Sequence, residues 1–258
     1  MVRGQFTHKT DKSQISTTDI LGVNIADINI RQLTDFTMKN LENLKGDYLC
    51  VSNVHTTVTA YEDEVYRNIQ NSGIMAIPDG NPLAVVGKKR GCKNIERITG
   101  ITYMRKIFDI SREKHYRHFF YGSTQNTLDK MCENLKREYP YLDIAGMYSP
   151  PFRKLTDTES SQVIELLNNA NADFIWIGLG AIKQEIFMWE NQGTVNSFMI
   201  GVGAGFDYLA GNIRQAPKFM QQHSLEWLFR LCQQPKRLFK RYLYTNTKFI
   251  LHICRKQG

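Results

Sequence analysis

Short apolar runs rich in β-branched and aromatic residues alternate along this chain with segments of helical spacing, and this alternation restricts the fold most. We predict strands over 48–54, 74–77, 118–121, 142–145, 174–178 and 198–202, and helices over 57–72, up to Glu138 and over 157–169. Strands separated by helices and joined by short loops are typical of a parallel sheet covered on both faces. The sequence therefore predicts an α/β fold with a Rossmann-like, mainly parallel sheet.

The pattern changes after Gly211, where helical spacing continues without further strands. Apolar residues keep this spacing up to Pro235, and pairs of basic and apolar residues then alternate with a period of four, which predicts an amphipathic helix. Residues 211–258 contain ten basic residues and one acidic residue, a charge of +9, whereas the whole chain carries +8 and residues 1–210 therefore −1. We predict a mobile leader over 1–18, an α/β catalytic domain over 19–210 and a basic appendage over 211–258.

Composition narrows the class of protein. The 258 residues are 42% hydrophobic and 22% charged, which excludes collagen-like, disordered and disulfide-scaffold chains. No apolar run approaches the roughly 18 residues of a membrane-spanning helix. The five cysteines form no CxxC pair, so we expect buried free thiols in a reducing cytosolic setting. His115 and His118 are three residues apart, but no acidic or thiol residue completes a metal-binding spacing with them, and the chain has no Asp-x-Asp, so we expect no metal site.

Polar residues follow the first two predicted strands. Asn53 and Thr56 come after the strand at 48–54, where a helix N-cap is the simpler interpretation. Asp79 lies in the turn at 78–82, which two prolines stiffen. An Asp-Gly pair is common in ordinary turns, but a carboxylate fixed on a rigid loop is also what a general base needs. The spacing alone leaves both interpretations of Asp79 open.

Glycines follow the strands at 174–178 and 198–202. The first turn, 178–185 (GLGAIKQE), opens a helix, and its glycines and Lys183 suit a phosphate group, although such turns also occur for packing alone. The second, 201–207 (GVGAGFD), has three alternate glycines and places Asp207 where it could accept a hydrogen bond from a base or a sugar. This second turn lies too late in the chain for a typical NAD fingerprint. Ligands of parallel sheets bind at such strand ends.

The basic appendage also carries aromatic residues, namely Trp227, Phe229, Phe239, Tyr242 and Tyr244. Aromatic side chains fit the headgroup level of a bilayer, and basic residues are attracted to anionic lipid, so this pattern favours an interfacial helix. Nucleic acid would also accept such a stripe of positive charge.

Seven short motifs occur in order between Asp19 and Arg241. They are 52–56 (SNVHT), 78–80 (PDG), 96–100 (ERITG), the strand end at Gly122, 183–185 (KQE), 201–203 (GVG), and 216–218 (APK) with 225–230 (LEWLFR). Together they resemble the WecG/TagA/CpsF family of bacterial glycosyltransferases. The resemblance implies sugar transfer from a nucleotide-sugar donor, UDP-linked, to a polyprenyl-diphosphate-linked glycan acceptor in the synthesis of capsule or other exopolysaccharides.

The resemblance further implies an inverting reaction without metal or other cofactor, in a cytoplasmic protein peripherally associated with the inner face of the cytoplasmic membrane. It assigns the base to Asp79, with Asn53 and Arg97 as further catalytic residues. The predicted donor-binding residues are Thr56, Gly122, Gly178, Gly180, Lys183, Gln184, Gly203 and Asp207. The predicted phosphate- or membrane-binding residues of the appendage are Arg230, Arg237, Lys240 and Arg241.

Two positions depart from the family pattern. Ile182 stands where many members have a proline, and Asn81-Pro82 replaces a pair of small or apolar residues. Both bear on which sugar is used, but neither removes a proposed catalytic group.

The competing interpretation is a nucleic-acid-binding protein whose basic tail lies on phosphates, which predicts salt-sensitive binding of DNA or RNA. The neutral body with its glycine-rich strand ends favours the transferase without a nucleic-acid partner, and leaves association into a homo-oligomer open.

Overall fold

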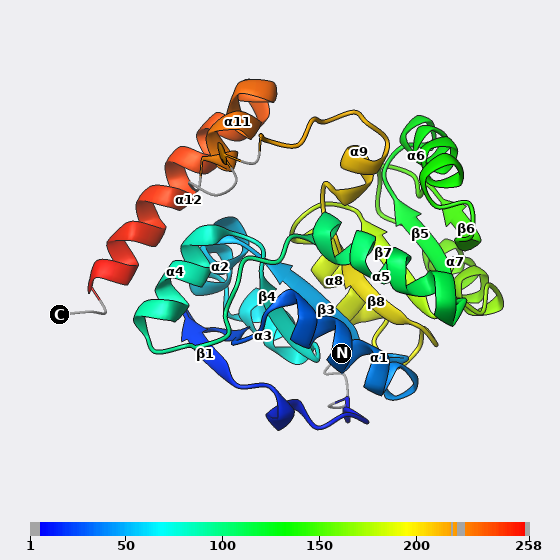
Figure 1. Ribbon diagram of the computed structural model, residues 1–258, viewed down its shortest axis with the longest axis horizontal. Coiled ribbons are helices and arrows are strands. Elements are labelled where there is room, and N and C mark those ends of the chain that lie inside the picture. The colour runs from blue at the N-terminus through cyan, green and yellow to red at the C-terminus, as the bar shows by residue number, and fades with distance from the viewer. Residues whose placement is uncertain (1–5, 218, 221–224, 256–258) are drawn as a thin grey trace.

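The computed structural model describes residues 6–217, 219–220 and 225–255 (Figure 1). Its described part contains an eight-stranded sheet in the order β1-β2-β4-β3-β8-β7-β5-β6, and every neighbouring pair except β1–β2 is parallel. The strands are β1 (Thr17–Ile20), β2 (Val23–Ala26), β3 (Tyr48–Ser52), β4 (Met75–Pro78), β5 (Arg117–Gly122), β6 (Asp143–Tyr148), β7 (Phe174–Gly178) and β8 (Phe198–Gly201). The predicted α/β fold is confirmed.

Helices cover both faces of the sheet. They are α1 (Ile30–Leu44), α2 (Val54–Glu62), α3 (Glu64–Ser72), α4 (Asn81–Lys89), α5 (Gly100–Lys114), α6 (Gln125–Glu138), α7 (Asp157–Asn169), α8 (Lys183–Glu190), α9 (Gly205–Leu209), α11 (Glu226–Gln233) and α12 (Pro235–Arg255). Alternate residues of β3 enter two separate apolar clusters, as the period of two in a strand requires. One cluster includes side chains of α1, α5, α6 and α9, and the other those of α2, α4, α7 and α8.

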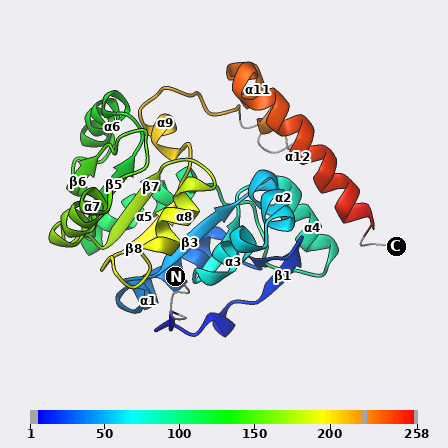
Figure 2. The same cartoon turned by 180° about the vertical axis from the view of Figure 1, so that it is seen from behind.

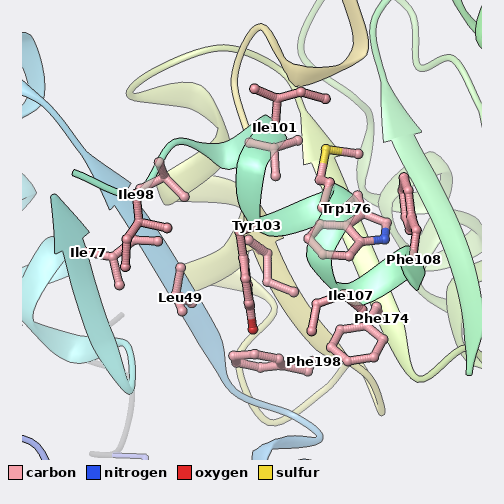
Figure 3. Close-up of a cluster of buried hydrophobic side chains, with 14 of the residues drawn as sticks. Leu49, Ile77, Ile98, Ile101, Tyr103, Ile107, Phe108, Phe174, Trp176 and Phe198 are labelled. Carbon is pink, nitrogen blue, oxygen red and sulfur yellow. The ribbon is translucent and has the colours of Figure 1, made fainter. Parts of the chain in front are cut away.

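The first of these clusters is rich in aromatic residues. Figure 3 shows Tyr103 and Phe108 of α5 beside Trp176 and Phe174 of β7. His118 is fully buried next to them, where its Nδ1 accepts a hydrogen bond from Trp176 Nε1 at 3.1 Å and its Nε2 pairs with a serine hydroxyl. Burial lowers the pKa of His118 to about 3, so this imidazole is a neutral part of the core.

The predicted helix over 57–72 is two helices, because Asp63 interrupts it. Asp63 has extended backbone angles, ends α2 and caps α3 by accepting a hydrogen bond from Tyr66 N at 3.1 Å. Strand β6 is longer than predicted, whereas α7 and β7 have the predicted bounds. The expectation of buried thiols is right for Cys50 but wrong for Cys232 and Cys254, which are exposed.

The N-terminal region packs on the body. The first five residues of the expected leader lie outside the described residues, but Thr17 and Thr18 already belong to β1, so the expected boundary at 18 falls inside a strand. Leu21 and Gly22 both have positive φ and form the tight turn of the β1–β2 hairpin. Ahead of the hairpin, Lys12 Nζ donates to the carbonyls of Asn71 and Gly73.

The segment beyond Gly211 leaves the sheet and ends in α11 and α12, as both views show (Figures 1 and 2). Pro235 is the first residue of α12, a position where its missing N–H costs nothing. The far half of α12 lies against α2, where Phe249 and Ile253 are buried in the second apolar cluster. Lys218 and Lys256 of the predicted appendage lie outside the described residues. Within the described chain, no helix combines the length and apolarity needed to cross a membrane.

Candidate active site

The four strand ends singled out in the sequence lie side by side. Strands β4, β3, β8 and β7 are consecutive in the sheet and parallel, so their carboxyl ends meet at one edge. The chain runs outward from β3 to β4 on one side and returns through β7 to β8 on the other, which makes the β3–β8 boundary a switch point of the sheet. Ligands of open α/β sheets bind at such a point.

Asp79 is fixed at this edge through its main chain. Its N–H donates to Ser52 O at 2.8 Å, which ties the end of β4 to the end of β3. Its carbonyl accepts from Arg97 Nε at 3.1 Å, and the next residue, Ile98, donates to Pro78 O at 2.8 Å. These bonds give the carboxylate the rigid support that a general base needs.

Asn53 is both a helix cap and a neighbour of Asp79. Its Oδ1 accepts hydrogen bonds from His55 N at 3.0 Å and Thr56 N at 3.2 Å, which completes the capping of α2. This leaves the amide nitrogen to donate to the carboxylate of Asp79, a bond that favours its ionised form. Thr56 is fully buried and bonded to Asn53, so its hydroxyl supports the cap rather than an open surface.

The pKa of Asp79 lies above the usual range of a carboxyl group, because burial penalises the charged form more than its neighbours stabilise it. The positive charges of Arg230 and Arg97 oppose this effect, whereas Glu226 adds to it. Arg230 and Glu226 come from α11, so the appendage contributes directly to the electrostatics of Asp79.

The appendage covers the strand ends through paired charges. Arg97 Nη2 forms an ion pair with Glu226, and both side chains are only 21% exposed. Arg230 lies over the ring of Tyr208 in α9, with its guanidinium carbon 5.9 Å from the ring centre, a cation–π geometry. One arginine of the body and one of the appendage therefore lie beside the same carboxylate.

Three buried polar atoms around this region have no hydrogen-bond partner among the described residues: His55 Nδ1, Tyr208 Oη and Arg241 Nε. Burial and the nearby Arg241 lower the pKa of His55 to about 4. Buried polar atoms are normally hydrogen-bonded, so these atoms, which come from α2, α9 and α12, mark a place where a polar ligand could complete the structure.

The glycines of the two turns differ in what surrounds them. A side chain at Gly122 would collide with the main chain of Gly178, and one at Gly178 would collide with the ring of Phe206, so packing alone explains both glycines. Gly180 and Gly203 have positive φ and open space around them. Their main chains are the ones a ligand could approach, and the donor-binding roles of all four remain predictions.

The other predicted donor residues lie at different depths. Lys183 is exposed at the start of α8. Gln184 is buried, and its amide is engaged with Gly203 N at 3.0 Å and with Glu185 at 2.8 Å, so it supports the turns from below. Asp207 accepts from Asn212 Nδ2 at 3.2 Å, which holds the chain as it leaves α9.

The four predicted cations of the appendage separate into two pairs. Arg230 and Arg241 are half-buried and face the body, whereas Arg237 and Lys240 are exposed. Arg230 and Arg237 lie close enough to Arg241 to lower its pKa, although burial contributes more.

Sequence reasoning missed Tyr208 and the ion-pairing role of Glu226. Glu226 is the lone acidic residue of the basic tail, a signal that it has a specific partner. Tyr208 gave no sequence signal. Among the described residues, no group of three or more His, Cys, Asp or Glu side chains could hold a metal ion.

Comparison with known proteins adds the following relationships. The model of the glycosyl transferase WecG/TagA/CpsF family matches residues 18–258. Two relatives carry the name N-acetylglucosaminyldiphosphoundecaprenol N-acetyl-beta-D-mannosaminyltransferase. One, from Bacillus spizizenii, is 28% identical over 76% of this chain and 75% of its own length. The other, from Bacillus subtilis strain 168, is 26% identical over 89% and 88%.

A protein of the same name from Staphylococcus aureus strain MW2 is 24% identical over 88% of this chain and 89% of its own length. The family model spans the sheet from β2 to β8, the strand-end turns and the appendage. The chain belongs to the WecG/TagA/CpsF family of glycosyltransferases.

Proposed function

We propose that this protein transfers an N-acetylhexosamine or related hexose from a UDP-sugar to a glycan carried on polyprenyl diphosphate, with inversion at the anomeric carbon. The names of the relatives support the class of acceptor and the type of sugar. The observation that carries the proposal is the position of Asp79, a rigidly held carboxylate between Asn53 and two arginines at the switch point of the sheet.

In this reaction, Asp79 takes the proton of the acceptor hydroxyl while that oxygen bonds to the anomeric carbon. The bond from this carbon to the nucleotide diphosphate breaks, and the diphosphate leaves with the electron pair. The raised pKa of Asp79 suits a base, because a carboxylate with a higher pKa accepts a proton more readily.

The negative charge that develops on the leaving diphosphate needs fixed positive groups. Arg97 and Arg230 lie beside Asp79, Arg241 lies near Arg230, and the main chains of Gly180 and Gly203 are open to a ligand. Prearranged donors of this kind stabilise a developing charge more strongly than water does. We assign the unpartnered Tyr208 Oη and His55 Nδ1 to the same polar ligand.

The appendage is suited to bring this site to the membrane that carries the acceptor. Phe239, Leu243 and Ile250 are exposed along α12, and exposed Arg237 and Lys240 lie on the same helix. An amphipathic helix with basic and apolar residues binds the interface of an anionic bilayer. We therefore place the protein at the cytoplasmic face of the membrane as a peripheral protein.

Asp79→Asn tests the proposal. With a UDP-N-acetylhexosamine and a polyprenyl-diphosphate-linked acceptor, we expect turnover to fall by about 10²- to 10⁴-fold, the usual share of a positioned base. Thermal stabilisation by the UDP-sugar should remain, because the variant keeps the size and shape of the side chain. Asp157→Asn, in the first turn of α7, is the matched control and should leave turnover unchanged. Wild-type turnover in Asp79→Asn would refute the assignment of the base.

A further inference from the structure

Glu185, in the first turn of α8, is a fully buried carboxyl group that receives three hydrogen bonds. Its Oε2 accepts from Ile182 N at 2.6 Å and from Tyr66 Oη at 3.2 Å, and its Oε1 accepts from Gln184 Nε2 at 2.8 Å. Its exposed fraction is 0%. Burying a carboxyl group costs free energy of folding unless the group is hydrogen-bonded in this way. Glu185 is therefore part of an internal hydrogen-bond network and not a surface charge.

The bond to Ile182 N holds a strained turn. Ile182 has φ 76° and ψ −54°, the angles of a rare γ-turn that a β-branched residue avoids. Glu185 supplies half of a capping box here, but the isoleucine side chain cannot supply the other half. The shape of the turn that connects β7 to α8 is therefore held by the buried Glu185 carboxylate.

The same carboxylate is connected to the two other central strand ends. On one side, Tyr66 Oη accepts from Gln70 Nε2 at 2.9 Å, and Gln70 Oε1 accepts from Ser52 at the end of β3 at 2.5 Å. On the other side, Gln184 Oε1 accepts from Gly203 N at 3.0 Å, after β8. All the hydroxyl and amide donors of the first branch point toward Glu185, which is the arrangement expected around a negative charge.

We propose that Glu185 is a positioning residue: through Ile182 N and Gln184 it sets the main-chain shape of the turns at Gly180 and Gly203 that receive the diphosphate of the nucleotide donor. This inference rests on the proposed function. Gly180 precedes Ile182 by two residues and has open space around it, and Gly203 is bonded directly to Gln184. Backbone groups bind a diphosphate well only when their directions are fixed in advance.

Glu185→Gln tests this role. The variant keeps the volume of the side chain, but one carboxylate oxygen becomes an NH2 group, which cannot accept a hydrogen bond. This group faces the donor of either Gln184 or Tyr66, so at least one of the three bonds is lost. We expect the KM for the UDP-sugar to rise by about tenfold or more, which is the effect of losing a hydrogen bond to a charged group, while kcat changes far less.

The chain offers a matched control in Glu159, which occupies the same third position of a capping box on α7. Glu159→Gln makes the same change at the same helix position next to the edge strand β6, away from Gly180 and Gly203, and should leave the KM unchanged. A purely structural role for Glu185 would lower the thermal stability and the fraction of active enzyme without changing the KM of the folded molecules, and this result would overturn the proposal.

A second pair of variants tests the strained turn itself, because Glu185→Ala removes the bond to Ile182 N outright. Glycine adopts positive φ without strain, so Ile182→Gly should restore a large part of the donor affinity when it is combined with Glu185→Ala. If the double variant binds no better than Glu185→Ala, the strain of Ile182 is not what the carboxylate holds, and the proposal fails. Absence of UDP-sugar turnover in the wild-type protein would instead contradict the proposed function.

Discussion

The strand ends and the appendage surround the same carboxylate, but they are held in place by different means. Asp79 is fixed by main-chain bonds to Ser52 and by Arg97. Helices α11 and α12 are held by the Arg97–Glu226 ion pair, by a second pair between Glu62 and Lys248, and by buried side chains of α12. The proposed base is thus part of the sheet and is held beside Arg97 of the body, whereas Arg230, which also influences it, belongs to the appendage.

This difference indicates that the sheet and the appendage have different roles at the site. The hydrogen-bonded sheet fixes the position of the proposed base, whose geometry must not change during the reaction. The appendage provides positive charge near Asp79, and side-chain contacts such as the two ion pairs hold it in place. Regions with few buried contacts open at a lower free-energy cost than the core does. The appendage is therefore expected to move away from the site without unfolding the sheet.

Truncating one aromatic side chain in the body and one in the appendage should give the largest effects on stability. Phe108→Ala removes a fully buried ring of the central cluster and should lower the free energy of unfolding of the whole domain by about 3 to 5 kcal/mol. Phe249→Ala should leave the domain's unfolding transition nearly unchanged but raise amide exchange across α11 and α12. Chemical denaturation and hydrogen exchange distinguish the two; equal loss of global stability in both variants would show that the appendage is part of one cooperative unit.

The ion pair between the regions should give a smaller but specific effect. We expect a double-mutant cycle of Arg97→Gln and Glu226→Gln to show a coupling of roughly 1 to 2 kcal/mol in RT ln(kcat/KM), because both side chains are mostly buried. The pair Glu62–Lys248 at the other end of α12 is more exposed and serves as the control, with a coupling below about 1 kcal/mol. Independent effects of the Arg97 and Glu226 changes would mean that the contact does not join the two regions functionally.

Much of the fold could be predicted because its signals are local. The strand at 174–178 and the helix at 157–169 were predicted with their bounds, since continuous apolar runs and a capping Thr156 mark them clearly. The first 47 residues and the region of α5 gave no prediction of strands or helices. Strand β1 is short and largely polar, and it is formed by pairing with β2. Such pairing is tertiary information that a single strand does not contain.

The sequence indicated which residues gather at the candidate site, but not how deeply each one is buried or whether it serves packing. Sequence pattern placed Asp79 at a strand end and the family resemblance pointed to Arg97, and the structure brings the two together. The pattern did not distinguish glycines that serve packing, Gly122 and Gly178, from those open to a ligand, because this depends on which neighbour fills the space. Nor did it predict that Gln184 would be buried below the turns, where it is bonded to the main chain of a distant strand end.

The central claim is that the appendage sets the charge state of a base fixed in the sheet, and the pH dependence of kcat/KM tests it most directly. Burial raises the pKa of Asp79, so activity should fall as the pH drops through that raised value. Arg230 stabilises the ionised carboxylate, and Arg230→Gln should therefore move this acidic limb to higher pH. Glu226 has the opposite effect, and Glu226→Gln should move it to lower pH. Shifts in the same direction, or no shift in either variant, would contradict the account.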